Sequence, residues 1–279
     1  MVLDTTYVAN NATEAAQKLA TYGFVVLEKA VPYHVLDALA AQIHDDFAFY
    51  QRQPYLNREE NLQPGCLPQR FCLNHCSNWR KPAWQDFVRE ILQGMTGEVV
   101  NEVFLCKVID TIGGDVVCSG FRENQPLHED WPSCPTRAIP MTLSASVALI
   151  PIVASMGAMR IIPDPWRRAG GFLTPPGLAQ EPAEWRAAQL EMPKGSVLLR
   201  DVNTWHGGCM NISEWDRVLP AVRFIGWHTL HKLGHRPSKC LPSQIYNTLE
   251  PIIQASTWYL WHEGQEDSEL DEAIRCLHV

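Results

Sequence analysis

The sequence lacks the cysteine patterns that organise small secreted domains and zinc modules. Its nine cysteines are an odd number, lie scattered along 279 residues and never form a CxxC pair. A disulfide framework and a structural zinc site are therefore disfavoured, and we expect free thiols in a reducing compartment.

Targeting signals and long hydrophobic runs are also missing. The N-terminus shows no basic segment followed by an apolar one, so no signal peptide is expected. The longest apolar stretch, residues 145–154, is interrupted by Ser146 and Pro151 and is too short to cross a bilayer. These features favour a cytoplasmic protein that has no membrane partner.

Positive charge is scarce. The chain has 23 Lys and Arg residues against 31 Asp and Glu residues, and its formal net charge is −8. No broad basic field is available to attract nucleic acid, so a small molecule is the expected partner. Since 46% of the residues are apolar and 19% are charged, the chain has ample material for a folded core.

No internal repeat, low-complexity tract or Gly/Ser linker divides the chain, and we expect one domain over residues 1–279. Its N-terminal part, residues 1–97, should be largely helical, and helices should return over 240–279. The expected N-terminal elements are a helix over 13–21, a strand over 24–27, a helix over 32–50, a loop over 54–81 and a helix over 82–94.

Residues 98–230 read as a β core. Short apolar or alternating runs, separated by Gly and Pro, indicate a sandwich or barrel rather than βαβ units. The expected fold is mainly β with flanking helices (α+β), a double-stranded β-helix or jelly roll of the cupin type. Strands are expected at 99–109, 115–120, 141–150, 158–162, 196–200 and 218–226, with turns at 113–114 and 170–171.

Two residues of metal-ligand type lie close together in the segment Gln125-Pro-Leu-His128-Glu-Asp130. In an extended segment positions i and i+2 project to the same face, so His128 and Asp130 can point at one spot. An imidazole nitrogen and a carboxylate oxygen are two of the three ligands of an iron(II) facial triad. By itself His-x-Asp is common, and taken alone it is better explained by a surface histidine beside an exposed acid.

A distant histidine and an arginine extend this pattern. An apolar strand should deliver His206, and Gly207 and Gly208 would let the backbone approach a metal and its co-substrate. Arg217 should begin a strand antiparallel to the one that carries His206, where its guanidinium could hold a carboxylate. Each residue alone has a plain structural reading. In combination they indicate a metal site with open positions and an anchor for an anionic co-substrate.

These motifs resemble the phytanoyl-CoA dioxygenase family of iron(II)- and 2-oxoglutarate-dependent oxygenases. The resemblance covers most of the chain, and the motif Arg200–Gly208 is similar to members that oxidise natural products. Where the family often has Gly-Ser-His, residues 164–167 read Asp-Pro-Trp-Arg, which weakens analogies of substrate. The matching segments are 22–27, 125–130, 157–163 and His206-Gly-Gly with Asn211, Ser213 and Arg217.

The resemblance implies a 2-oxoglutarate-dependent dioxygenase with iron(II) as cofactor and 2-oxoglutarate and O₂ as co-substrates. It would hydroxylate, desaturate or cyclise an unactivated C–H bond of a small natural product and release succinate and CO₂. Related halogenases lack the carboxylate of Asp130, so hydroxylation or another oxidation is favoured over halogenation. The implied catalytic metal ligands are His128, Asp130 and His206, and the implied co-substrate residues are Arg217, Gln125 and Ser213.

Two other classes stay open. A cupin-like metal isomerase or zinc hydrolase would use similar ligands, but would not need Arg217 as a dicarboxylate anchor. A non-catalytic ligand-binding protein on the same fold would bind iron weakly and form no succinate. Residues 57–78 and 258–261 are candidate lids, although a core or homodimer contact is the favoured reading of the second segment.

Overall fold

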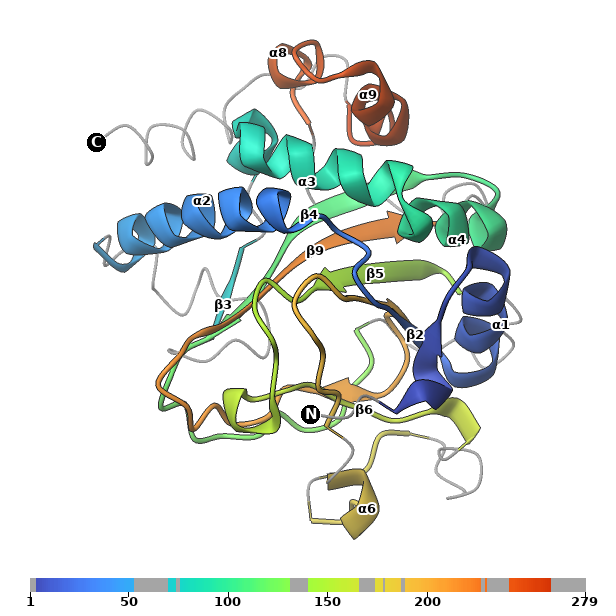
Figure 1. Ribbon diagram of the computed structural model, residues 1–279, viewed down its shortest axis with the longest axis vertical. Helices are drawn as coiled ribbons and strands as arrows, with labels where there is room; N and C mark the ends of the chain where they lie inside the picture. Colours follow the sequence, from blue (N-terminus) through green and yellow to red (C-terminus); the bar gives the residue numbers. More distant parts are fainter. Residues whose placement is uncertain are drawn as a thin grey trace.

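The structure is a computed structural model, and two β-sheets form its centre (Figure 1). The large sheet has the strand order β1-β2-β7-β5-β9-β4-β3, and the small sheet pairs β6 with β8. The structure describes residues 4–52, 70–73, 76–130, 140–165, 174–177, 179–186, 189–226, 229 and 241–261. Most of the candidate lid at 57–78 and the turn expected at 170–171 lie outside these ranges.

Among the described strands, β1 pairs with β2 in parallel and the other neighbours are antiparallel. The strands are β1 Val8–Ala9, β2 Phe24–Leu27, β3 Arg70–Cys72, β4 Val108–Val117, β5 Thr142–Val147, β6 Arg160–Ile161, β7 Val197–Asp201, β8 His206–Gly207 and β9 Arg217–Ile225.

Local sequence signals set the helix ends. The Asn11 side chain caps α1 by accepting from the Glu14 N–H, and Gly23 ends that helix in the left-handed conformation. Pro82 stands in the first turn of α3, where its missing N–H costs nothing. The helices are η1 Thr5–Tyr7, α1 Ala12–Tyr22, α2 Tyr33–Arg52, η3 Cys76–Arg80, α3 Pro82–Gln93, α4 Met95–Phe104, η4 Ala154–Met156, α6 Ala183–Arg186, α8 Ser243–Tyr246 and α9 Pro251–Thr257.

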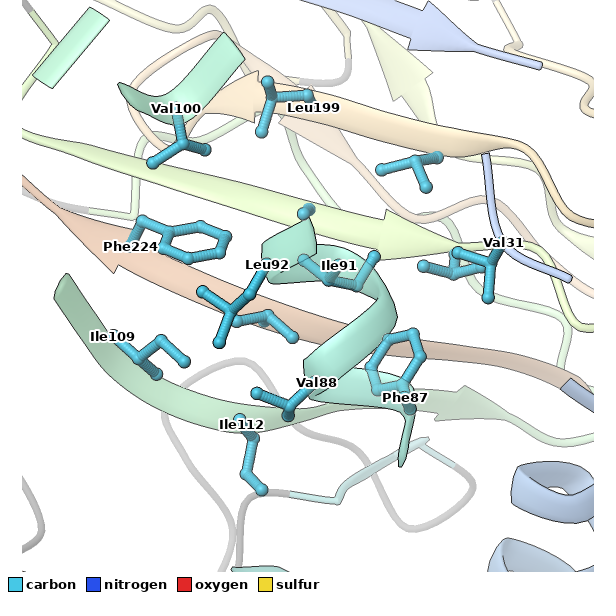
Figure 2. Packing of buried hydrophobic residues seen from close by; sticks show 14 of the residues in the cluster. Val31, Phe87, Val88, Ile91, Leu92, Val100, Ile109, Ile112, Leu199 and Phe224 are labelled. Carbon is cyan, nitrogen blue, oxygen red and sulfur yellow. The ribbon is translucent and has the colours of Figure 1, made fainter. Parts of the chain in front are cut away.

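Both faces of the large sheet are buried. In Figure 1, α2 and α3 lie on one side of β4 and β9, and β6 lies on the other side. Figure 2 shows the helix side, where Phe87, Val88 and Leu92 of α3 pack towards Ile109 and Phe224 of the sheet. A strand buried on both faces needs apolar residues at every position, which explains the unbroken run of β2.

The second face of the large sheet packs against the small sheet. Phe24 and Leu198 belong to the same buried cluster as Ile161 of β6, whereas their neighbours Val25 and Leu199 belong to the helix-side cluster. We call the space between the two sheets the inter-sheet core. Two antiparallel layers around one interior form the expected jelly roll with flanking helices, so the expected fold class is confirmed.

Three expectations about the boundaries of the β core are wrong. Residues 99–104 are helical rather than extended, because Val99, Val100 and Phe104 bury one face of α4. Gly113 and Gly114 form no turn, since β4 runs through both and pairs with β9. The large sheet also takes in β1 from the part expected to be largely helical and β3 from the expected loop, which also contains η3, whereas the strand expected at 24–27 is confirmed as β2.

The C-terminal helices expected after Pro242 are confirmed as α8 and α9. Leu260 is buried in the helix-side cluster, and Trp261 stacks on Tyr246, so the segment 258–261 belongs largely to the core. Trp258 is 41% exposed. None of the helices within the described ranges is long and apolar enough to span a membrane.

At Gly114 the backbone of β9 leaves no room for a side chain on β4. A Cβ there would lie 2.0 Å from the Leu219 carbonyl oxygen, and φ is +127°. We expect Gly114→Ala to lower the free energy of unfolding by more than ~3 kcal/mol, because backbone strain adds to a displaced strand.

Gly120→Ala is the matched control for this substitution. Its φ is +75°, but no atom lies within 4 Å of the added Cβ, so only the strain of about 1–2 kcal/mol remains. Urea unfolding measures both variants. Equal losses at the two positions would show that the β4–β9 approach is not tight.

Candidate metal centre

The segment that carries His128 and Asp130 runs alongside β8. His128 and His206 exchange two backbone hydrogen bonds, with N···O distances of 2.9 and 3.2 Å, and form an isolated antiparallel bridge. Further along, the Gln125 N–H donates to the Gly208 carbonyl at 2.8 Å. A Cβ on Gly207 would lie 2.7 Å from the Gln125 carbonyl oxygen, so this pairing requires glycine after the histidine.

This pairing brings three ligand atoms together. Asp130 Oδ1 lies 3.5 Å from His128 Nε2 and 3.4 Å from His206 Nε2. One ligand atom from each of the three residues lies within 4.8 Å of the others. A metal about 2.1 Å from each ligand would separate neighbouring ligands by roughly 3 Å, so this donor set fits a two-histidine, one-carboxylate site.

Each imidazole is oriented through its other nitrogen. His128 Nδ1 lies 3.0 Å from the Pro126 carbonyl oxygen, and His206 Nδ1 lies 2.8 Å from the Thr204 carbonyl oxygen. When each Nδ1–H donates to the carbonyl two residues earlier, the unprotonated Nε2 is directed towards Asp130. This is the tautomer that a metal requires, fixed by the fold itself.

The protonation states also suit a metal. Burial and the Arg200 cation together lower the pKa of His206 to about 4, although Asp130 opposes both effects. Burial raises the pKa of Asp130, but His206 and Arg200 outweigh burial and hold it well below its usual value. At neutral pH the histidine is therefore neutral and the aspartate ionised, as ligands must be.

The expected route of the chain through the site is wrong. β7 ends at Asp201, and His206 lies on β8, which belongs to the small sheet. The strand that begins at Arg217, β9, belongs to the large sheet and pairs with β4 and β5. A turn makes the crossing from β7 to β8, with the Thr204 N–H donating to the Asp201 carbonyl at 2.9 Å. The Thr204 hydroxyl then bonds the Gly23 carbonyl at 2.8 Å. One apolar run in the sequence cannot reveal that the chain changes sheets.

Arg217 begins β9 with a fully buried side chain. It faces the inter-sheet core, because Leu219 two residues later belongs to that cluster. Its Nη1 donates to the Gly157 carbonyl at 2.7 Å and its Nη2 to Asp115 Oδ2 at 2.5 Å. These contacts hold the guanidinium on the same side of the large sheet as the metal ligands.

Gln125 and Ser213 have local partners. The Gln125 side-chain oxygen accepts from the Gly208 N–H at 3.1 Å, which extends the pairing with β8. The Ser213 hydroxyl donates to Asn211 Oδ1 at 2.7 Å. Asn211 in turn donates to the carbonyls of Val117 and Trp215, so the pair shapes the turn before β9. Contact of Gln125 or Ser213 with a co-substrate stays a prediction.

Arg200 is the site residue that sequence reasoning missed. Its Nη2 donates to Asp130 Oδ2 at 3.0 Å, and its Nη1 lies 3.4 Å from His206 Nδ1. The alternation of β7 contains the missing signal. Val197 and Leu199 face the helices and Leu198 faces the inter-sheet core, so Arg200 must place a charge in the same interior.

The sequence matches the family model described as "Phytanoyl-CoA dioxygenase (PhyH)" over residues 19–219, which is most of the chain. The chain belongs to the phytanoyl-CoA dioxygenase family. The matched range contains β2, all three candidate metal ligands and Arg217, so the expected family is confirmed. It is a family of iron(II)- and 2-oxoglutarate-dependent dioxygenases, and the expected enzyme class and cofactors are confirmed with it.

Solved structures share the fold at low sequence identity. The carbocyclase SnoK from nogalamycin biosynthesis is 14% identical, with a TM-score of 0.54 over 82% of this chain and 94% of SnoK. AviO1 from Streptomyces viridochromogenes Tue57 is 15% identical, with a TM-score of 0.52 over 81% of this chain and 97% of AviO1. HygX from Streptomyces hygroscopicus, solved with nickel and 2-oxoglutarate, is 16% identical, with a TM-score of 0.51 over 77% and 87%. No curated protein matches the sequence.

The depressed pKa of His206 has a measurable effect on stability in this family member. Between its unfolded value of 6.5 and its folded value of about 4, the unfolded chain binds a proton that the folded chain does not bind. Acidification therefore lowers the free energy of unfolding by about 1.4 kcal/mol per pH unit within that window. From pH 7.5 to 5.0 we expect a loss of about 2 kcal/mol from this residue.

Urea unfolding of the metal-free protein in chelator, with wild type and His206→Gln compared at both pH values, measures this term. Other groups titrate alike in the two proteins, and Asp130 with its depressed pKa contributes only at lower pH. The wild type should lose about 2 kcal/mol more than the variant. Identical losses would mean that His206 is not held neutral.

Proposed function

We propose that the protein is an iron(II)- and 2-oxoglutarate-dependent oxygenase that oxidises an unactivated C–H bond of a small organic substrate. His128, Asp130 and His206 are its metal ligands. The convergence of His128 Nε2, Asp130 Oδ1 and His206 Nε2 supports this proposal most directly. Family membership agrees with the same reading.

Bound iron(II), 2-oxoglutarate and O₂ supply the oxidising power, with release of succinate and CO₂. The chain provides the geometry. With three ligands from the protein, an iron(II) ion held here would keep open positions for a two-point co-substrate and O₂. His128 and His206 reach the ion as neutral donors because the Pro126 and Thr204 carbonyls hold their Nδ1 atoms.

Arg217 serves in this proposal as the anchor for the far carboxylate of 2-oxoglutarate. A planar guanidinium can bind a carboxylate through two parallel hydrogen bonds, which a lysine cannot do. Burial of Arg217 strengthens such a bond, and the Gly157 carbonyl and Asp115 hold the group in place. Gln125 and Ser213, which shape the backbone on either side, complete the co-substrate site in this proposal.

The proposed substrate is a small natural product. HygX has been solved with hygromycin B bound, and SnoK is a carbocyclase of nogalamycin biosynthesis. Those ligands and reactions belong to the named proteins, and the shared fold supports only the substrate class for this chain. Hydroxylation, desaturation and ring formation are all consistent with a retained Asp130. A homodimer stays a prediction.

A metal hydrolase or isomerase on the same fold is the main rival. It would use the same three ligands, but it would not need the buried Arg217 to bind the carboxylate of a dianionic co-substrate. A non-catalytic binding protein is the other rival. Neither rival accounts for both the converging triad and Arg217 on one side of the large sheet.

Anaerobic addition of iron(II) and 2-oxoglutarate tests the proposal. Wild type should develop the weak visible charge-transfer band of a chelated 2-oxo acid, and O₂ should then yield succinate. Ala at any of His128, Asp130 or His206 should weaken iron binding at least tenfold, since each removes one ligand.

His44→Ala is the matched histidine control, because the His44 side chain is 84% exposed on α2. It should bind iron and form the band like wild type. A wild-type protein that binds iron without the band, or that prefers zinc, contradicts the oxygenase proposal and favours the hydrolase or isomerase.

Arg217→Met should weaken 2-oxoglutarate binding to the metal-loaded protein by about 30- to 1000-fold. Loss of a charged, two-point hydrogen bond costs roughly 2–4 kcal/mol. Affinity for the metal should hold within a few-fold, because Arg217 bonds the Gly157 carbonyl and Asp115. Calorimetry with Ni(II) and then with 2-oxoglutarate separates the two quantities.

Arg223→Met is the control for this substitution. Arg223 lies on the same strand and face as Arg217 but pairs with Asp110 at 2.6 Å. Its loss should leave 2-oxoglutarate affinity within a few-fold of wild type. If both variants bind 2-oxoglutarate as wild type does, Arg217 is not the anchor.

A further inference from the structure

Arg200 is a buried charge with no assigned role. It lies on β7, and only 7% of the residue is exposed. Strand alternation turns it towards the inter-sheet core, since Val197 and Leu199 pack with the helices. A guanidinium is rarely buried unless charged or polar groups surround it, because desolvation of the cation is costly.

Arg200 bonds one metal ligand and lies beside another. Its Nη2 donates to Asp130 Oδ2 at 3.0 Å, and its Nη1 donates to the Val202 carbonyl at 3.3 Å. The same Nη1 lies 3.4 Å from His206 Nδ1, the ring nitrogen that bonds the Thr204 carbonyl. Two ligands of the triad therefore rest against one buried side chain.

Every one of these contacts lies on the side of the ligands away from the metal position. Asp130 Oδ1 is the oxygen near both Nε2 atoms, and Arg200 holds Oδ2 instead. On His206, Nε2 faces Asp130 and Arg200 approaches Nδ1. Arg200 consequently supports the ligands without competing for the atoms that coordinate.

We propose that Arg200 is a positioning residue that makes Asp130 a one-oxygen ligand. A free carboxylate can bind a divalent ion through one oxygen or through both. With two histidines, a two-oxygen aspartate would fill four of six positions, and 2-oxoglutarate would take the remaining two. A bond from Arg200 to Oδ2 keeps the third open position, which the proposed function needs for O₂.

The charge of Arg200 acts in the same direction. One aspartate and one arginine cancel, so a divalent metal at this site keeps its full double charge for the dianion 2-oxoglutarate. Orientation and charge can be separated by substitution. Arg200→Met removes both, whereas Arg200→Lys keeps the charge but has a single donor nitrogen, which cannot replace the two that reach Asp130 and Val202.

Ni(II) affinity and the structure of the Ni(II)-loaded protein test this inference without any turnover. In wild type, one Asp130 oxygen should lie about 2.1 Å from the metal and the other should remain on Arg200. In Arg200→Met both oxygens should bind the metal, and Ni(II) affinity should rise about tenfold, since a second oxygen coordinates and a neighbouring positive charge is lost. Arg200→Lys should fall between the two.

Arg223→Met is the matched control, because Arg223 is an arginine on the same face of the large sheet. Ser144 of β5 is the register partner of both Arg200 on β7 and Arg223 on β9, so the two arginines lie two strands apart. The control should bind Ni(II) like wild type, and circular dichroism checks the fold of every variant. Unchanged Ni(II) affinity and one-oxygen binding in a folded Arg200→Met or Arg200→Lys protein overturn the inference.

The inference rests on the proposed function only for the reason why an open metal position is needed; the effect of Arg200 on Asp130 is tested independently. If wild type binds Ni(II) but not 2-oxoglutarate, the oxygenase proposal fails and the Arg200 test still stands. If wild type forms the charge-transfer complex while both Arg200 variants bind metal as wild type does, the function stands and the role of Arg200 is refuted.

Discussion

The two backbone hydrogen bonds between His128 and His206 are the constraint on which the rest of the site depends. They fix the register of the segment that carries His128 and Asp130 against the two-residue strand β8. A shift by one residue would turn both side chains together to the opposite face, away from His206. Glycine at 207 permits the approach, and the carbonyls of Pro126 and Thr204 then set the rings. The ligand geometry is thus a product of main-chain pairing rather than of side-chain packing alone.

The large sheet serves two layers at once. Its helix-side face packs against the helices and holds most of the apolar core. Its other face carries the buried charged residues Arg200 and Arg217 beside apolar neighbours. Buried cations are tolerated there because each has an acceptor in place, Asp130 for one and Asp115 for the other. Rigid strands hold such groups more accurately than loops can, which suits a centre whose chemistry depends on position.

Sequence reasoning could predict the jelly roll, the His128–Asp130 pair and the distant His206, because each rests on local alternation or on a family motif. It failed where spacing is ambiguous or where partners are remote. Val99 to Phe104 fits a helix as well as a strand, and Gly113-Gly114 looks like a turn until the close approach of β9 explains it. The change of sheet before His206 and the contact of Arg200 with Asp130 depend on tertiary structure, which no single-chain pattern contains.

The position of β2 has a consequence for how this protein is made. β2 lies between β1 and β7, and its residue Val25 pairs with Leu199, so its antiparallel neighbour is synthesised far later. At ordinary rates of translation, a delay on the order of ten seconds or more separates the two strands. During that time the apolar run Phe24–Leu27 has only local helices to cover it. The nascent chain therefore carries an unpaired strand edge for most of its synthesis, and the metal centre cannot form until that edge is covered.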